Sequence, residues 1–247
     1  DQGLTDNLIE RCKRSGFNAM CLTVDTVVAG NRERDHRWGF TTPPKLTFKS
    51  LLSFALHPMW SVNYLTHEKF KLANVSHFTK NGSSIAKGVM EYINEQYDPK
   101  MSWKDAEYCI KKWGGPFAIK GVMSVEDAKR AVQIGASAIM LSNHGGRQLD
   151  GSRAPFDQLP AIADAVGGKI EIILDGGIRR GTHVLKALSL GATACSFGKG
   201  FLFALGAGGQ KGVEALLQRM HDEIRRDMIL LGCKTIKDLN KTNIAYR

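Results

Sequence analysis

The sequence predicts an α/β fold built on a parallel sheet, and three observations lead to that prediction. The chain has 247 residues, the usual length of a complete (β/α)8 barrel. Short apolar runs alternate with segments of helical periodicity. The segments "AVQIGASAIMLSN" and "ALSLGATACSFGK" share one order of helix end, Gly-Ala, strand and polar residues. Repeated βα units of this kind favour a parallel sheet, in a barrel or an open arrangement.

Five strands are expected because five short runs are nearly continuous in apolar residues. Strands of a parallel sheet carry such runs because helices cover the sheet and both of its faces are buried. The predicted strands comprise residues 19–25, 117–122, 138–143, 171–176 and 194–199.

Helices are predicted between these strands. Ser124 and Asp127 have the spacing of a helix N-cap, and Gly135 follows as a helix stop. A second helix is expected over about 182–190, where a glycine ends the apolar pattern. A longer amphipathic helix is expected over about 213–231, because apolar residues recur there at helical spacing.

Residues 41–100 interrupt the βα pattern and are too long for an ordinary connection. The segment contains the apolar and aromatic run "LTFKSLLSFALHPMWSVNYL". Between residues 41 and 80, five lysines stand against a single acid, Glu68: Lys45, Lys49, Lys69, Lys71 and Lys80. Apolar bulk with lysine is typical of a segment lying on a membrane surface. A long loop that packs on its own barrel or on a neighbouring subunit is the alternative.

Composition narrows the partners and the compartment. The formal net charge is +10, which fits anionic ligands, an anionic membrane surface or a solvated basic surface. The basic residues are not interleaved with aromatics, so a nucleic-acid partner is not expected. Five scattered cysteines form no CxxC pair, so we expect no metal site and a reducing, intracellular compartment. The chain opens without a secretory signal pattern and has no apolar run of spanning length.

Polar residues gather just after the predicted strands, where α/β folds of both kinds keep their active sites. They are Asp25, Lys120, residues 142–147, residues 175–179, and Gly198 with Lys199. Two glycine-rich stretches with cations, "DGGIRRG" and "FGKG", predict a phosphate site because glycine lets backbone N–H groups approach an anion. Lys120 ends a strand, where a lysine can hold an electron-rich atom, form a Schiff base or simply face solvent.

The stretch "SNHGGRQLD" places a histidine and an arginine three residues apart after a strand. A neutral imidazole accepts protons near neutral pH, so His144 is a candidate base. Arg147 can bind a carboxylate through two parallel hydrogen bonds and fix a substrate beside that base. Asp25, from another strand end, can orient the imidazole. Taken alone, His144 also fits a structural role at a strand end.

Together, "SNHGGRQLDG", "DGGIRRG", "LTVDT" with Arg32, "IKGV" and "SWKDAE" resemble the FMN-dependent α-hydroxy-acid dehydrogenase and oxidase family. The resemblance starts at residue 1 and corresponds to the C-terminal two-thirds of that family's proteins. It implies a TIM barrel, bound FMN, and oxidation of an (S)-2-hydroxy acid, L-lactate first, to the 2-oxo acid. It also implies quinone or oxygen as electron acceptor and a homo-oligomer, usually a tetramer. The "ALHPMW" segment looks most like membrane-associated bacterial members, so we expect a cytoplasmic protein peripheral on the inner face of the cell membrane.

Carried over residue by residue, the resemblance assigns roles at the strand ends. His144 is the expected base with Asp25 as its partner, and Arg147 and Arg32 are expected to face the substrate. The residues expected to bind FMN divide into those at the flavin ring and those at the ribityl chain and phosphate. The first are Thr23, Lys120 and Ser142, and the second are Asp175, Gly176, Gly177, Ile178, Arg179, Gly198 and Lys199.

Two departures from the family pattern qualify these expectations. Lys199 stands where the family usually has arginine, so the bidentate fork toward phosphate is lost. The family also has about three βα units and a substrate tyrosine upstream of the matching region. We therefore expect residues 1–247 to form one barrel domain that supplies about five βα units and is incomplete at its N-terminus, with 41–100 inserted. Two rivals remain: another FMN- or phosphate-binding barrel oxidoreductase, and a non-catalytic fragment or subunit.

Overall fold

The computed structural model describes residues 2–37, 46–68, 74 and 97–245. The chain divides into two compact units, one of Asp1–Val27 with Lys100–Arg247 and the other of Val28–Pro99. The two units are described separately below. The expectation of one barrel domain carrying an insertion stays a prediction.

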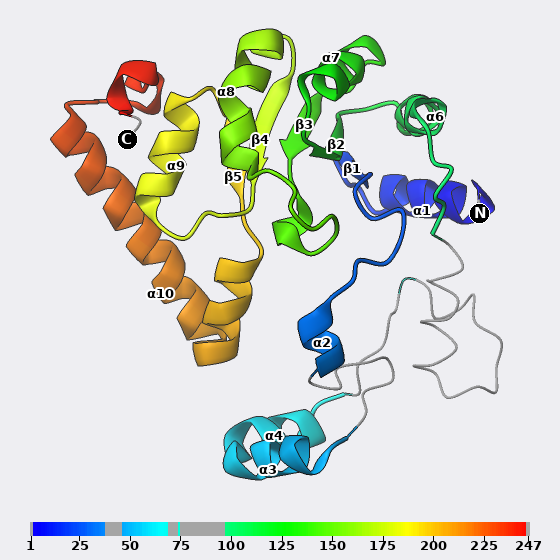
Figure 1. The fold of residues 1–247 in the computed structure, drawn as a ribbon, viewed down its shortest axis with the longest axis vertical. Helices are drawn as coiled ribbons and strands as arrows, with labels where there is room; N and C mark the ends of the chain where they lie inside the picture. Colours follow the sequence, from blue (N-terminus) through cyan, green and yellow to red (C-terminus); the bar gives the residue numbers. More distant parts are fainter. Residues whose placement is uncertain (1, 38–45, 69–73, 75–96, 246–247) are drawn as a thin grey trace. The chain divides into compact units, whose positions relative to one another are not determined.

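The first unit contains a parallel sheet of five strands in the order β1-β2-β3-β4-β5 (Figure 1). All five predicted strands are confirmed, and the parallel α/β class with them. The strands are β1 (Met20–Thr23), β2 (Phe117–Val122), β3 (Ala138–Leu141), β4 (Glu171–Asp175) and β5 (Ala194–Ser196). Four of them end before the predicted run does. The residues that end those four runs lie beyond the strands.

Helices pack along one face of this sheet. They are α1 (Gln2–Arg14), α6 (Trp103–Trp113), α7 (Val125–Gln133), α8 (Pro155–Val166), α9 (Gly181–Ser189) and α10 (Lys199–Leu231). The predicted caps of α7 are confirmed, since the Ser124 side chain accepts a hydrogen bond from the Asp127 N–H. Short 3-10 turns occur at η2 (His144–Gly146), η3 (Ile236–Asp238) and η4 (Lys241–Asn243).

The long C-terminal helix begins earlier than the sequence suggested. We expected it from about residue 213, but α10 starts at Lys199, directly after β5. It is broken at Gly208 and Gly209, whose backbone angles are not helical. These glycines interrupt the apolar periodicity, which explains why the first part of the helix was not recognised.

Side chains alternate across the sheet, and only the helix-facing set is buried. Ile119, Ile139 and Leu141 are fully buried and join the main core cluster with residues from the helices. Lys120 and Met140 point to the opposite face and are half-buried. The apolar runs led us to expect strands covered on both faces. Within the described residues, the second face is covered only in part.

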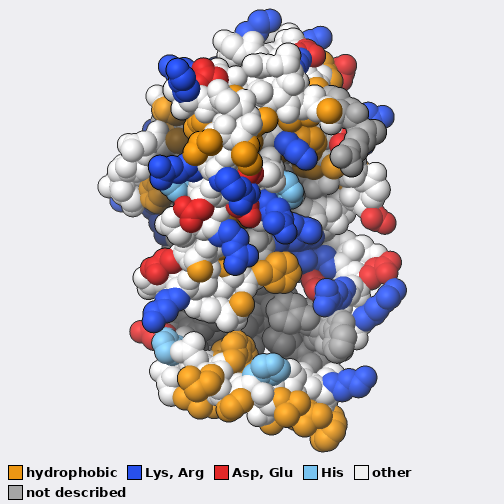
Figure 2. Space-filling view, turned by 90° about the vertical axis from the view of Figure 1, so that its left-hand side faces the viewer, with side chains coloured by type: hydrophobic (Ala, Val, Ile, Leu, Met, Phe, Trp, Pro, Cys, Tyr) orange, Lys and Arg blue, Asp and Glu red, His pale blue; other side chains and the backbone are white. Residues whose placement is uncertain are grey.

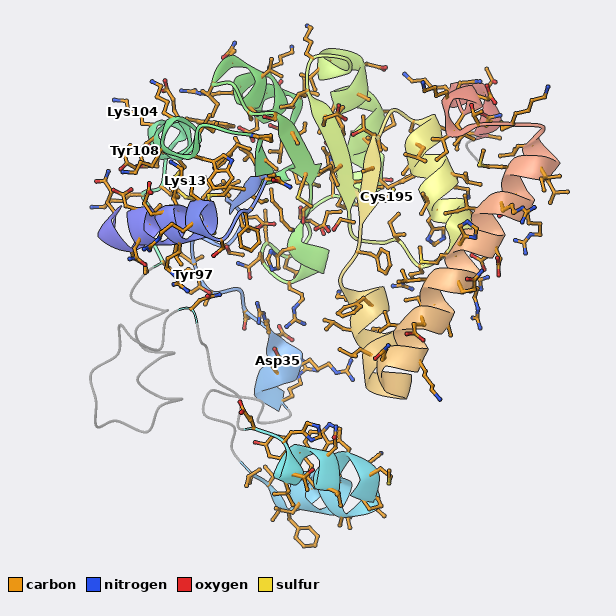
Figure 3. All side chains as sticks on the ribbon, turned by 180° about the vertical axis from the view of Figure 1, so that it is seen from behind. Lys13, Asp35, Tyr97, Lys104, Tyr108 and Cys195 are labelled. Atoms are coloured by element: carbon orange, nitrogen blue, oxygen red, sulfur yellow. The ribbon has the colours of Figure 1, made fainter. Side chains whose placement is uncertain are left out.

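Polar contacts join α1 to α6 on the β1 side of the sheet. The Tyr108 hydroxyl donates to the Asp6 carboxylate at 2.8 Å, and Lys13 Nζ donates to the Lys112 carbonyl at 2.7 Å (Figure 3). Ile9 of α1 is buried in the same core as Trp113 of α6. These contacts fix the helix that precedes β1 and so fix the edge strand.

The second unit contains α2 (Glu33–Arg37) and a helical hairpin of α3 (Phe48–Leu56) and α4 (Pro58–Thr66). Thr47 and Ser50 form a capping box at the start of α3. The rings of Phe54, Trp60 and Tyr64 stack with centroid separations of 5.3 and 5.2 Å. No residue of α3 or α4 is buried.

Hydrophobic side chains gather on this hairpin, as Figure 2 shows at its lower end. Met59 is 85% exposed and Phe48 is 81% exposed. Among the five lysines predicted to face a membrane, Lys49 lies on α3. The other four, Lys45, Lys69, Lys71 and Lys80, lie outside the described residues. None of the described helices has both the length and the apolar character needed to cross a bilayer.

Candidate functional site

The parallel register brings the predicted polar residues to one edge of the sheet. Thr23 at the end of β1 pairs with Lys120 of β2, and Asp175 at the end of β4 pairs with Ser196 of β5. Ser142 directly follows β3, which lies between β2 and β4. Thr23 and Lys120, which are 97 positions apart in the chain, are thus neighbours, as expected at the carboxyl ends of parallel strands.

Lys120, Ser142 and Asp175 form a closed network of short hydrogen bonds. Lys120 Nζ donates to Ser142 Oγ and to Asp175 Oδ2, each at 2.7 Å. The Ser142 hydroxyl donates to the same Asp175 oxygen at 2.8 Å. Ser142 is completely buried, so its hydroxyl depends on these partners. The network holds the lysine ammonium in place at the strand ends.

The charge state of Asp175 follows from this network. Burial acts to raise the pKa of Asp175, but hydrogen bonds from Lys120, Ser142 and Ser196, with the positive charge of Lys120, outweigh it. The pKa of Asp175 therefore lies below its ordinary value. Asp175 is an anion at neutral pH, and the pair it forms with Lys120 carries no net charge.

His144 is held by two different parts of the fold. Its Nδ1 lies 3.1 Å from Asp25 Oδ1, across 119 positions of sequence. Its backbone N–H donates to Ser142 Oγ at 3.1 Å, which connects it to the lysine network. When its Nδ1–H donates a hydrogen bond to Asp25 Oδ1, Nε2 is the ring nitrogen that can accept a proton. The imidazole is partly exposed, with 32% of its side chain accessible.

The backbone at His144 is unusual. Its φ of +55° makes it the only residue other than glycine with positive φ in the described part of the chain. Such a conformation is uncommon for a residue with a side chain, and surrounding contacts must hold it. Gly145 and Gly146 continue in the same left-handed region. The two glycines after the histidine are therefore needed for the turn that presents the imidazole.

Two residues that sequence reasoning missed support Asp25. Gln148 Nε2 donates to the Asp25 carbonyl at 3.2 Å. At Gly121, a Cβ atom would lie 2.8 Å from the Asp25 Cβ, so a larger residue there would displace Asp25. Both stand inside stretches already noted, "SNHGGRQLD" and "IKGV", but only the folded geometry shows their role. Asp25 Oδ2 is buried and has no hydrogen-bond partner among the described residues.

The glycine-rich loop after β4 forms an open, positively charged turn. Gly176 and Gly177 have φ of +92° and +73°, and no atom lies within 4 Å of a Cβ built on either. Ile178 contributes its side chain to the core, so its backbone alone can face a ligand. Arg180 is 3.7 Å from Glu223 of α10. Arg179 is exposed, and its backbone N–H donates to His183 Nδ1 at 3.2 Å.

The second glycine-rich turn, at Gly198 and Lys199, contacts the histidine turn, which consists of His144, Gly145 and Gly146. Gly198 caps the N-terminus of α10 and Lys199 is its first residue. Lys199 Nζ donates to the Gly145 carbonyl at 2.7 Å.

The two predicted substrate arginines have exposed side chains. Arg147 ends the η2 turn and is exposed. Arg32 precedes α2 in the other unit and is also exposed. The structure thus assembles the base, its acid partner and the lysine network, while the placing of both arginines at a substrate stays a prediction.

Comparison with known proteins agrees with this arrangement. A family model described as FMN-dependent dehydrogenase matches residues 1–246. An L-lactate dehydrogenase of Vibrio cholerae is 39% identical over 100% of this chain and 65% of its own length. An L-lactate oxidase of Nostoc is 41% identical over 97% of this chain and 60% of its own length. The chain therefore spans somewhat less than two thirds of these relatives.

Solved structures give the same result. A crystal structure of the monotopic membrane protein (S)-mandelate dehydrogenase superposes with a TM-score of 0.91 and 31% identity. That match covers 98% of this chain and 64% of the other. A mandelate oxidase variant with (S)-mandelic acid gives a TM-score of 0.74 at 33% identity, covering 98% of this chain and 59% of the other. The five-stranded sheet thus matches part of a TIM barrel.

Proposed function

We propose that this chain, which belongs to the FMN-dependent dehydrogenase family, oxidises an (S)-2-hydroxy acid to the 2-oxo acid, and that L-lactate is its first candidate substrate. The observation that carries the proposal is the His144–Asp25 pair beside the Lys120–Ser142–Asp175 network on one sheet edge. A base oriented by a carboxylate is what removal of a substrate proton requires. The names of the relatives, an L-lactate dehydrogenase and an L-lactate oxidase, support lactate as substrate.

The residues present fit FMN, the cofactor of the family. Gly176 and Gly177 leave open space where side chains would otherwise stand, so their backbone can approach a polar chain closely. The exposed Arg179 and the N-terminus of α10 at Gly198 supply positive charge for a phosphate. We assign the ribityl and phosphate end of FMN to residues 175–179, Gly198 and Lys199. When bound, FMN supplies the acceptor for the two electrons of the substrate.

At the ring end, we assign contacts to Thr23, Lys120 and Ser142. The Lys120 ammonium is fixed by two hydrogen bonds of 2.7 Å, so it presents a positive charge at a constant position. Such a charge stabilises electron density that arrives on a neighbouring ring. Asp175 limits this effect, because its carboxylate neutralises the lysine when no other anion is near.

His144 takes up one proton from the substrate at Nε2, whether that proton comes from the hydroxyl or from Cα. Asp25 then stabilises the imidazolium, since its Oδ1 is 3.1 Å from Nδ1. We assign Arg147 and Arg32 to the substrate carboxylate, which a guanidinium can bind through two parallel hydrogen bonds. Quinone or oxygen as the final acceptor, and a homotetramer, follow from the family resemblance alone.

The proposal is tested by replacing His144 with alanine and following flavin absorbance under anaerobic L-lactate. We expect the variant to keep FMN while the rate of flavin reduction falls by about 10²–10⁴-fold, the usual contribution of a positioned base. His221→Ala, an exposed histidine on α10, is the matched control and should reduce normally. Flavin reduction at the normal rate in His144→Ala would reject the assignment.

We also propose that the protein lies peripherally on the cytoplasmic face of the cell membrane through residues 45–80. The α3–α4 hairpin supports this, because apolar side chains cover it and none of its residues is buried. The structural similarity to a monotopic membrane protein supports the same proposal. Trp60 and Tyr64, stacked on one another, are residue types that favour the boundary between lipid and water.

A further inference from the structure

Lys199 belongs to the predicted phosphate turn, and its side chain also contacts the histidine turn. Its Nζ donates to the Gly145 carbonyl at 2.7 Å, and Gly145 directly follows His144. We propose that Lys199 is a positioning residue that couples binding at the phosphate end of the cofactor site to the placement of His144. This inference rests on the proposed function.

The histidine turn needs support from outside itself. His144, Gly145 and Gly146 all have positive φ, and Gly145 to Arg147 are exposed. The Gly146 N–H bonds to the Asn143 carbonyl at 3.0 Å and to its side-chain oxygen at 3.2 Å. These bonds lie within the turn, so they can move with it as a unit. An uncommon backbone conformation persists only where the surrounding structure holds it.

Contacts from other strand ends hold the turn at different points. Asp25, after β1, binds the imidazole of His144. Lys199, after β5, binds the backbone carbonyl of the next residue. The turn follows β3, and β1 and β5 are the two edge strands of the sheet. Lys199 is therefore the contact that reaches the turn from the side of the proposed phosphate site.

The chemistry of lysine suits this double role. An ammonium carries three N–H donors, so the bond to Gly145 leaves two for phosphate oxygens. Its flexible stem lets the charge serve both partners, whereas the planar guanidinium of arginine has donors in a fixed fork. A Cβ on Gly145 would come within 3.2 Å of Lys199 Nζ. Glycine at this position is what allows the ammonium to approach the carbonyl so closely.

The experiment compares Lys199→Met, which removes the donor, with Lys199→Arg, which retains one. Lys211→Met, an exposed lysine on the same helix, is the control. The first measurement is hydrogen exchange over residues 142–150 in FMN-saturated protein, because the His144 amide, which donates to the buried Ser142 Oγ at 3.1 Å, reports movement of the turn away from the lysine network. We expect faster exchange in Lys199→Met, partial recovery in Lys199→Arg, and no change in Lys211→Met.

The second measurement is flavin reduction by L-lactate at saturating FMN. Lys199→Met should lower the limiting rate by about ten- to a hundredfold, the size of effect a small misplacement of a reacting group produces, and change KM less. Lys199→Arg should restore part of the rate. If Lys199→Met weakens FMN binding but leaves both the exchange and the saturated rate unchanged, Lys199 only binds phosphate and the inference is wrong.

The two proposals fail in different ways. Normal reduction in His144→Ala would reject the function without touching the exchange measurement. Unchanged exchange in Lys199→Met would reject the coupling while the function assigned to His144 still stands.

Discussion

The sheet core and the α3–α4 hairpin are both rich in apolar residues but use them in opposite ways. In β2, Phe117 is 1% exposed and Ile119 is 0% exposed. In α3 and α4, Leu65 is 79% exposed and no residue is buried. Hydrophobic composition alone therefore does not decide what a segment is for. The difference lies in whether the described part of the same unit supplies a partner surface.

That difference has a physical basis in the pattern of each segment. β2 alternates buried and half-buried residues, so one face packs on helices and the other carries Lys120 to the site. The hairpin has apolar side chains around much of its surface and stacks three of its own rings. A helix that is apolar on most sides is normally covered by protein or by lipid. The core thus stabilises the fold, and the hairpin presents a surface.

The largest contrast is expected in stability. Ile139→Ala leaves a cavity in the core and should lower the free energy of unfolding by about 2–5 kcal/mol. Leu65→Ala on the hairpin should change it by less than about 0.5 kcal/mol, because its side chain is already exposed. Urea unfolding followed by circular dichroism measures both. Equal losses would show that the hairpin is packed against protein.

The next effect is expected on membrane binding. Met59→Ser with Leu65→Ser should weaken sedimentation with anionic vesicles by about tenfold or more, since burying one large apolar side chain contributes about 1.5–3 kcal/mol. Leu230→Ser, a 78% exposed residue on α10, is the matched control and should bind as the parent does. Flavin reduction should be the same in both variants. Unchanged sedimentation of the double variant would reject the hairpin as the lipid-binding surface.

The smallest effect is expected in how the free energy of unfolding depends on pH, and it comes from Asp175 at the sheet edge. The folded pKa of Asp175 lies below its unfolded value, so its contribution to stability is present above the unfolded pKa of about 3.9. That contribution is lost as pH falls through the folded pKa, because the unfolded chain binds the proton more readily. Asp175→Asn should remove this part of the acid dependence of unfolding, measured by urea titration between about pH 2 and pH 5.

The hairpin contains no carboxyl group of this kind, because residues 46–67 include no aspartate or glutamate. Asp222→Asn, at an exposed carboxyl on α10, is the matched variant that also removes one carboxylate. An acid profile that is identical in Asp175→Asn and the parent would show that the lysine network contributes nothing to stability.

Much of the strand-end arrangement could be predicted from sequence, because strands of a parallel sheet end on one edge. Asp25, Lys120 and His144 were expected there and lie there. The partners within the site were less predictable. Lys120 and Asp175 were assigned to different parts of the cofactor, yet the structure bonds them directly. Which side chains meet across strands depends on register, and register is not visible in one sequence.

Other contacts could not be predicted because no residue pattern in the sequence marks them. Gln148 binds a backbone carbonyl, and that contact has no residue signature. Lys199 was expected at a phosphate because glycine and a cation stood together, and its bond to Gly145 requires knowing how two turns meet. Composition alone fits both lipid and protein as the partner of the hairpin, and the expectation of a membrane rests on the resemblance to membrane-associated members. The hairpin's lack of buried residues favours lipid.

The separation of Asp25 and His144 along the chain has a consequence for biosynthesis. A growing polypeptide emerges in order, so Asp25 is made well over a hundred residues before the imidazole it binds. Lys199 appears later still, more than fifty residues after the turn that it contacts. Because distant contacts form only after the chain between them has closed, the site is assembled late in folding. A nascent chain halted before β5 would hold four of the five strands of this sheet but would lack the Lys199 contact to the histidine turn.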